Sequence, residues 1–206
     1  MDYRRPTLAV LALAATWLTG ARADAQDRYF LEGMSRMNEA MGSILPSVLI
    51  LGAAAGIALH LTLARGWADD VGRLSAAGTV RIAALTVLVQ ALHFTEELST
   101  GFHARLPAVF ERVPMPLGFF ITFNVAWLLI WTLSVWGLSA RRRAALFPLW
   151  FLGIAALLNG VGHPLLSAVE GEYFPGLVTA PFIGVMGVAL LRHLRMATSD
   201  VDPLPD

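Results

Sequence analysis

The chain lacks cysteine and lysine altogether. Without cysteine it can form no disulfide, no thiolate metal site and no cysteine nucleophile. Its 15 basic residues are all arginine and they balance 15 acidic residues, so the formal net charge is zero. This balance excludes a basic nucleic-acid-binding domain and implies no electrostatic partner.

Charge of either sign is scarce. Only 15% of the 206 residues are charged, against roughly 25% in an average soluble domain. By contrast, 56% are hydrophobic, and the mean hydropathy is +0.63. A soluble sphere of this size could not bury so much apolar surface. The composition therefore excludes a disordered chain and an ordinary cytosolic enzyme, and it indicates an integral membrane protein.

Five apolar segments are each close to the roughly 20 residues that a helix needs to cross a bilayer. They predict transmembrane helices over residues 45–64, 79–99, 117–138, 146–165 and 176–194. In lipid, every backbone polar group must be satisfied within its own segment. We therefore expect an all-α fold, an integral membrane helix bundle over residues 45–195 that is followed by a short tail at residues 196–206.

The N-terminal segment, residues 1–25, has the features of a signal peptide. Arg4 and Arg5 precede a short apolar stretch from Thr7 to Gly20, and Ala23-Asp24-Ala25 is a small-residue cleavage pattern. We predict cleavage near Ala25, and an uncleaved anchor helix is the alternative.

A more polar segment, residues 26–44, carries one apolar helix face. Apolar side chains recur there at steps of four, three, four and three, at Phe30, Met34, Met37, Met41 and Ile44. An interfacial amphipathic helix and an extension that packs on the bundle both fit this pattern.

The distribution of arginine predicts the orientation. Arg141, Arg142 and Arg143 follow the third span, and Arg192 and Arg195 lie at the end of the fifth. Because cytoplasmic segments are enriched in arginine, we expect that loop and the C-terminus to be cytoplasmic. The 26–44 segment and the loop before the fifth span then lie outside. The expected location is a bacterial-type plasma (inner) membrane, with the lipid bilayer as partner.

Polar residues follow one face of the second span. His93, Glu96 and Glu97 are spaced i, i+3 and i+4, which places all three on one side of a helix. Thr86 and Gln90 extend the same face. Ionisable residues inside a span are costly and mark functional sites.

This residue set suits two kinds of chemistry. Two neighbouring carboxylates at low dielectric repel each other, which suits one of them to hold and transfer a proton. Imidazole and carboxylate groups are also ligands for a divalent metal, and the candidate metal ligands are His93, Glu97 and His163.

Polar residues of two other spans lie at a similar depth. With a rise of 1.5 Å per residue, Asn124 and Asn159 lie about 10 Å from the outer ends of their spans, as does His93. We predict one pocket in the outer half of the bundle, with His93, Glu96, Glu97 and His163 as catalytic residues. The predicted substrate contacts or supporting residues are Gln90, Asn124, Asn159 and Tyr173. The loop over residues 170–175 is expected to cap the pocket.

The run His93-x-x-Glu96-Glu97 resembles the signature of the HXXEE family of small multi-pass membrane proteins. Asn124 also falls where that family tends to have an asparagine. The resemblance covers about residues 82–191 and implies a membrane helix bundle.

A second region strengthens the resemblance. Asn159-Gly-Val-Gly-His163, and then Tyr173-Phe-Pro-Gly-Leu-Val-Thr179, are similar to the family's later Asn-x-x-x-His and Tyr-x-Pro-Gly-x-x-Thr patterns. The family has no established biochemical role, so the resemblance implies a site and does not imply a reaction.

Three functions remain open from the sequence. The first is an intramembrane enzyme that uses acid–base or metal-assisted chemistry on a lipid-like or otherwise apolar small molecule. The second is a protein that binds or transports protons or metal ions, to which the polar stripe of the second span would contribute. The third is a structural or accessory membrane subunit.

Overall fold

The computed structural model describes the backbone of residues 5–68 and 73–200, and the side chains of residues 30–68 and 76–199. The chain divides into two units, Met1–Gly42 and Ser43–Asp206. The predicted cleavage site near Ala25 lies outside the residues whose side chains are described. Cleavage therefore stays a prediction, which the intact mass of the mature protein can test.

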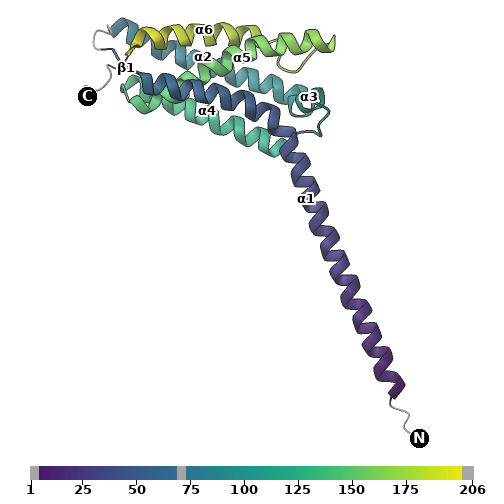
Figure 1. The fold of residues 1–206 in the computed structure, drawn as a ribbon. Helices are drawn as coiled ribbons and strands as arrows, with labels where there is room; N and C mark the ends of the chain where they lie inside the picture. Colours follow the sequence, from purple (N-terminus) through teal and green to yellow (C-terminus); the bar gives the residue numbers. More distant parts are fainter. Residues whose placement is uncertain (1–4, 69–72, 201–206) are drawn as a thin grey trace. The chain divides into compact units, whose positions relative to one another are not determined.

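The described elements are almost all helical (Figure 1). In chain order they are α1 (Arg5–Ala64), β1 (Arg65–Trp67), α2 (Arg73–Thr100), α3 (Phe102–Val109), α4 (Leu117–Ser139), the short 3-10 helix η1 (Arg143–Ala145), α5 (Leu146–Glu170), α6 (Ala180–Ala197) and β2 (Thr198–Asp200).

Five of the described helical segments are long and apolar enough to cross a membrane: Phe30–Ala64, Ala76–Thr100, Leu117–Ser139, Arg143–Glu170 and Ala180–Ala197. Many large apolar side chains remain exposed on these segments, as expected where lipid takes the place of water. The predicted all-α bundle with five spanning helices is confirmed.

The boundaries differ from the predicted ones in three places. The first predicted span began at residue 45, whereas α1 continues through this point with Pro46 inside the helix. The last one began at residue 176, whereas α6 begins at Ala180. Helix α3 was not predicted. Hydropathy marks the apolar core of a segment well, but a helix also continues through polar residues and ends where its backbone changes direction.

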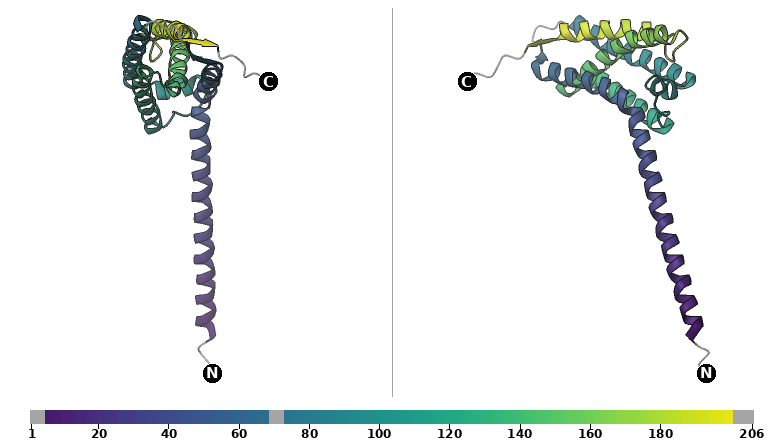
Figure 2. Two further views of the ribbon diagram at one scale, coloured as in Figure 1. Left: turned by 90° about the vertical axis from the view of Figure 1, so that its left-hand side faces the viewer. Right: turned by 45° about the vertical axis from the view of Figure 1, so that its right-hand side comes forward.

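Helix α5 has the most continuous buried face, and α2, α4 and α6 pack against it or against each other (Figures 1 and 2). It crosses α6 closely, because a Cβ atom on Gly160 would lie 2.4 Å from the Cα atom of Gly184. Small residues allow this approach of two backbones, and it fixes the height of α6 relative to α5.

One end of the bundle gathers the arginine-rich segments. β1 and β2 pair there as antiparallel strands, which places the end of α1 beside the end of α6. Arg141 donates a hydrogen bond to the carbonyl oxygen of Ala68 at 2.8 Å. The α1–α2 connection, the α4–α5 connection and the end of α6 therefore lie together, as the predicted orientation requires.

The opposite end holds α3 and the α5–α6 loop, residues 171–179. Arg105 of α3 pairs with Glu172 and, at 3.5 Å, with Glu170. The pairs tie the loop to α3 at the end of α2 where the predicted site lies.

Candidate functional site

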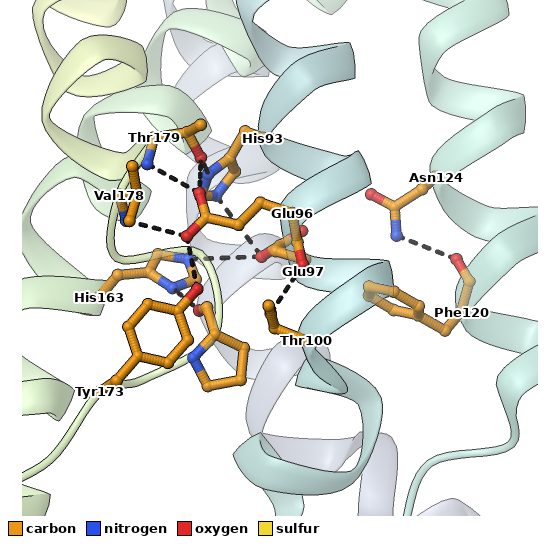
Figure 3. A network of polar contacts seen from close by, with 11 residues as sticks. His93, Glu96, Glu97, Thr100, Phe120, Asn124, His163, Tyr173, Val178 and Thr179 are labelled. Carbon is orange, nitrogen blue, oxygen red and sulfur yellow. Dashed lines mark hydrogen bonds and ion pairs between the residues drawn. The ribbon is translucent and has the colours of Figure 1, made fainter.

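Three buried side chains meet between α2 and α5 (Figure 3). His93 and Glu97 lie one turn apart on α2, and His163 lies on α5; their exposed fractions are 0%, 5% and 3%. The helical spacing of i and i+4 aims the two α2 side chains in the same direction. The packing of α5 against its neighbours then brings His163 to them.

One oxygen of Glu97 is close to both imidazole rings. Its Oε1 lies 3.5 Å from Nε2 of His93 and 3.4 Å from Nε2 of His163. The two rings meet edge to face with their centroids 4.7 Å apart. All three potential ligand atoms lie within 4.8 Å of one another.

The other carboxylate, Glu96, turns toward the α5–α6 loop. Its Oε1 accepts hydrogen bonds from the Tyr173 hydroxyl at 2.6 Å and the Val178 amide at 2.9 Å. Its Oε2 accepts from the Thr179 amide at 2.8 Å and the Thr179 hydroxyl at 2.5 Å. Because helix N-termini carry unpaired amides and attract negative charge, Glu96 of α2 caps the start of α6.

Tyr173 stays a hydrogen-bond donor over a wide pH range. Partial burial raises the pKa of its phenol above the ordinary value of 10.0, and its hydrogen bond to Glu96 raises this pKa further. At neutral pH the hydroxyl is therefore protonated and available to the carboxylate.

The hydrogen bonds of the two histidines determine which ring nitrogen carries the proton. Nδ1 of His163 lies 2.5 Å from the carbonyl oxygen of Pro175. A carbonyl only accepts, so Nδ1 of His163 donates, and in the neutral ring its Nε2 keeps a lone pair. Nδ1 of His93 lies 2.7 Å from the Thr179 hydroxyl, whose hydrogen is already donated to Glu96. In the neutral ring, Nε2 of His93 therefore also keeps a lone pair.

The result is three acceptor atoms that face one another. The buried Nε2 of His93 has no hydrogen-bond partner among the described residues. Such a group is costly unless a proton or a cation lies between the acceptors. Ligands about 2.0–2.1 Å from a tetrahedral zinc ion lie about 3.3–3.4 Å apart, which is close to the two nitrogen–oxygen distances here. The residues therefore fit a divalent metal.

The α5–α6 loop covers the two rings closely at Gly176. Its φ of 90° lies in the region that favours glycine. A Cβ atom here would lie 2.6 Å from Nδ1 of His163 and 3.0 Å from Cε1 of His93. The loop backbone thus lies directly against the cluster.

The structure does not bring every predicted residue to this cluster. Asn124 donates its hydrogen bond to the Phe120 carbonyl on its own helix, at 2.9 Å, apart from the histidines (Figure 3). Asn159 is half-buried on α5 and is not part of the cluster. Gln90 is buried on α2, and its Oε1 has no partner among the described residues.

The sequence did not predict two parts of the site, namely the side chain of Thr179 and the backbone groups of the α5–α6 loop. Thr179 lies between Glu96 and His93, and its only signal in the sequence was its place in the Tyr-x-Pro-Gly-x-x-Thr pattern. The Pro175 carbonyl and the amides of Val178 and Thr179 are backbone groups. Because every residue type supplies such groups, no sequence pattern reveals them.

A family model described as "Protein of unknown function with HXXEE motif" matches residues 84–190, just over half of the chain. The chain belongs to this family. The matched region holds all of the residues of the site described above. The comparison with curated proteins and the comparison with solved structures found no match.

Proposed function

We propose that this HXXEE protein is a membrane metalloprotein that binds one divalent ion through His93, His163 and Glu97. We further propose that the site carries out metal-assisted acid–base chemistry on a lipid-like or apolar substrate. The observation that carries the proposal is the set of three inward-facing acceptors, since with neutral rings each of these atoms has a lone pair to offer and none accepts a hydrogen bond from a described residue.

The hydrogen bonds behind the ligands support a metal more than a simple structural contact. Metal-bound histidines usually donate their other ring N–H to a carboxylate, a carbonyl or a water, which fixes the tautomer and the ring orientation. His163 does so to Pro175, and His93 does so to Thr179. Both rings therefore have the arrangement that a metal ligand needs.

The ligand types narrow the choice of metal and chemistry. Two imidazoles and one carboxylate suit zinc and similar divalent ions, and a site with three protein ligands leaves a position for water or substrate. The chemistry supplied by such an ion is activation of a water or polarisation of a carbonyl or phosphoryl oxygen. Glu96 is not the expected general base, because both of its oxygens already accept hydrogen bonds.

The surroundings support an apolar substrate. The ring of Phe102 lies 5.4 Å from the His163 ring, and that of Phe174 lies 6.0 Å from it, measured between centroids. Phe94 and Phe120 continue this buried aromatic cluster away from the histidines. The site also lies on helices apolar enough to cross a membrane, which favours a substrate that is itself dissolved in the bilayer.

Metal content tests the proposal directly. The protein is purified in detergent, stripped with chelator, reloaded with Zn²⁺ and analysed for bound metal. We expect one ion per wild-type chain, and none retained by His163→Ala or His93→Ala. His60→Ala is the matched control, because His60 is exposed on α1. Wild-type protein without zinc, or His163→Ala with a full complement, would contradict the proposal.

Turnover needs a separate measurement. Proteoliposomes that contain extracted membrane lipids are incubated with Zn²⁺, and the lipid composition is followed by mass spectrometry. A product formed by the wild type and absent with His163→Ala supports an enzyme. An unchanged composition in both, with normal metal binding, would reject lipid turnover and leave the metal site standing.

Ion transport is the second candidate, and the stripe below the site favours it. Thr86 and Gln90 are 0% and 5% exposed and continue the α2 face of His93 away from the α5–α6 loop. The Oε1 atom of Gln90 has no partner among the described residues. Zinc or proton flux into proteoliposomes that falls in Gln90→Leu, with metal binding intact, would favour transport over catalysis.

The proposed orientation places the arginine-rich end and the C-terminus in the cytoplasm of a bacterial-type inner membrane. The pairing of β1 with β2 and the Arg141 contact support one shared side for these segments. Reporter fusions at Ala140 and Gly171 should report opposite sides. The same side for both would reject this topology.

A further inference from the structure

We infer that Thr179 is a positioning residue that couples Glu96 to His93 and fixes the proton of His93 on Nδ1. Glu96 thus acts on the proposed metal ligand His93 indirectly, through the hydroxyl of Thr179. The inference deepens the proposed metal function and rests on it for its consequence, but the position of the proton on His93 can be measured without any metal.

Thr179 has too few hydrogens to donate to both of its neighbours. A threonine hydroxyl has one hydrogen to donate and two lone pairs. The Oγ1 atom lies 2.5 Å from Oε2 of Glu96 and 2.7 Å from Nδ1 of His93. Glu96 acts as an acceptor toward two backbone amides that can only donate. The hydroxyl hydrogen therefore goes to Glu96, and the hydrogen between Thr179 and His93 comes from the histidine.

The two adjacent glutamates of α2 face different partners. Consecutive residues on a helix point about 100° apart, since a turn holds 3.6 residues. Glu97 accordingly faces the two imidazoles, while Glu96 faces the start of α6. Through Thr179, the charge of Glu96 supports a proton on the far side of the His93 ring, which leaves the near nitrogen free to bind.

One loop orients both histidines. Pro175 accepts from His163, and Thr179 accepts from His93. Both belong to the α5–α6 loop, which Gly176 brings against the rings. Glu96 holds this loop by four hydrogen bonds. Removing the Thr179 hydroxyl should therefore affect His93 and leave the Pro175 contact of His163 unchanged.

Histidine ¹⁵N NMR on the metal-free protein tests the tautomer. The chain has five histidines, so each signal can be assigned by single replacement. We expect the wild type and Thr179→Ser to hold the Nδ1–H form of His93, and Thr179→Val to populate the Nε2–H form. His163 should keep its Nδ1–H form in all three. A wild-type His93 in the Nε2–H form, or an unchanged Thr179→Val, would overturn the inference.

Zinc affinity then tests the consequence. Loss of an outer-shell hydrogen bond typically weakens metal binding by about 10–100-fold, and we expect this loss for Thr179→Val and recovery for Thr179→Ser. Thr95→Val is the matched control, because the Thr95 hydroxyl bonds only to the Ala91 carbonyl among the described residues. If Thr179→Val shifts the tautomer of His93 but binds zinc as tightly as the wild type, then Thr179 fixes the proton of His93 without affecting zinc affinity. That result would reject the second part of the inference. If no variant and no wild type binds zinc, the proposed function fails instead.

Discussion

The two ends of the bundle use polar groups in opposite ways. At the arginine-rich end, arginines donate to backbone carbonyls near helix termini: Arg65 to Thr198 at 2.8 Å, Arg141 to Ala68 at 2.8 Å and Arg143 to Thr62 at 3.3 Å. These are the carbonyls that a helix or strand leaves unpaired at its end. Every such contact has a structural explanation.

At the site end, the polar groups include three that offer only acceptors to one another. His93, Glu97 and His163 are buried, and no helix end needs them. A bundle that required only stability would place apolar side chains here, because replacing a buried charged cluster by well-packed apolar residues is often neutral or stabilising. The arginines at one end therefore stabilise the fold, whereas the stability of the fold does not explain the buried cluster of His93, Glu97 and His163 at the other end.

The sharpest test of that difference is Glu97→Gln. The amide keeps the shape but removes the anionic ligand, so Zn²⁺ affinity should fall by more than about 100-fold, beyond the loss typical of an outer-shell change. In the metal-free protein, the new N–H donor can satisfy one imidazole nitrogen, and the free energy of unfolding should stay equal or rise by about 1 kcal/mol. Competition with a chelating dye and thermal unfolding in detergent measure the two effects. A loss of stability in the metal-free variant would mean that Glu97 is structural.

Gly176→Ala should destabilise the protein because the new Cβ atom strains the α5–α6 loop and overlaps His163. The positive φ and the 2.6 Å approach to His163 should cost about 2–4 kcal/mol of unfolding free energy, since strain and steric overlap add. Gly171 has a similar φ of 73°, but a new Cβ there would meet open space. Gly171→Ala should therefore lose less unfolding free energy, and its loss measures the backbone strain without steric overlap. Gly162→Ala, which lies in a helix with open space, should be neutral or slightly stabilising. Equal losses at Gly176 and Gly171 would show that the loop does not press on the histidines.

Tyr173→Phe should have a smaller effect. It removes one of four donors to Glu96, and a hydrogen bond to a charged group contributes about 1.5–3 kcal/mol. Because Tyr173 is 44% exposed, water can replace part of this hydrogen bond in the variant. We therefore expect Tyr173→Phe to lower the free energy of unfolding by about 1 kcal/mol. Since the raised phenol pKa keeps the donor protonated, the difference between wild type and variant should persist unchanged from pH 7 to pH 9. A difference that disappears by pH 9 would contradict the assignment of Tyr173 as donor.

Much of the fold follows from the sequence because its causes are local. Runs of apolar residues determine the spans, and the period of the helix places His93 and Glu97 on one face. The position of His163 in the outer half of the bundle also indicated that it would reach them, and the structure brings the three together. Depth says nothing about rotation around the bundle, however. Asn124 lies at a similar depth and turns its hydrogen bond back to Phe120.

The contacts of Glu96 were beyond the sequence. Both glutamates were predicted as catalytic carboxylates and Glu97 alone as a candidate metal ligand, but nothing predicted that Glu96 binds the start of α6. Their difference depends on the amides of Val178 and Thr179, and hence on where α6 begins. Hydropathy placed that start at residue 176, four residues early, because Gly176 and its neighbours are as apolar as the helix that follows. The N-terminus of α6 is defined by a carboxylate from another helix, which is a tertiary effect.

The smallest effect should come from Arg141→Ala at the opposite end. It removes the hydrogen bond to Ala68 and a contact with the face of Trp67, whose ring centroid lies 5.9 Å from the guanidinium carbon. Both contacts involve an exposed side chain, where such interactions contribute about 0.5–1 kcal/mol. We expect a loss in that range and an unchanged Zn²⁺ affinity, with Arg112→Ala, exposed beyond α3, as the control. If Arg141→Ala weakened zinc binding as much as we expect for Thr179→Val, the two ends would be coupled through the helices, and the arginine-rich end would belong to the function as well as to the fold.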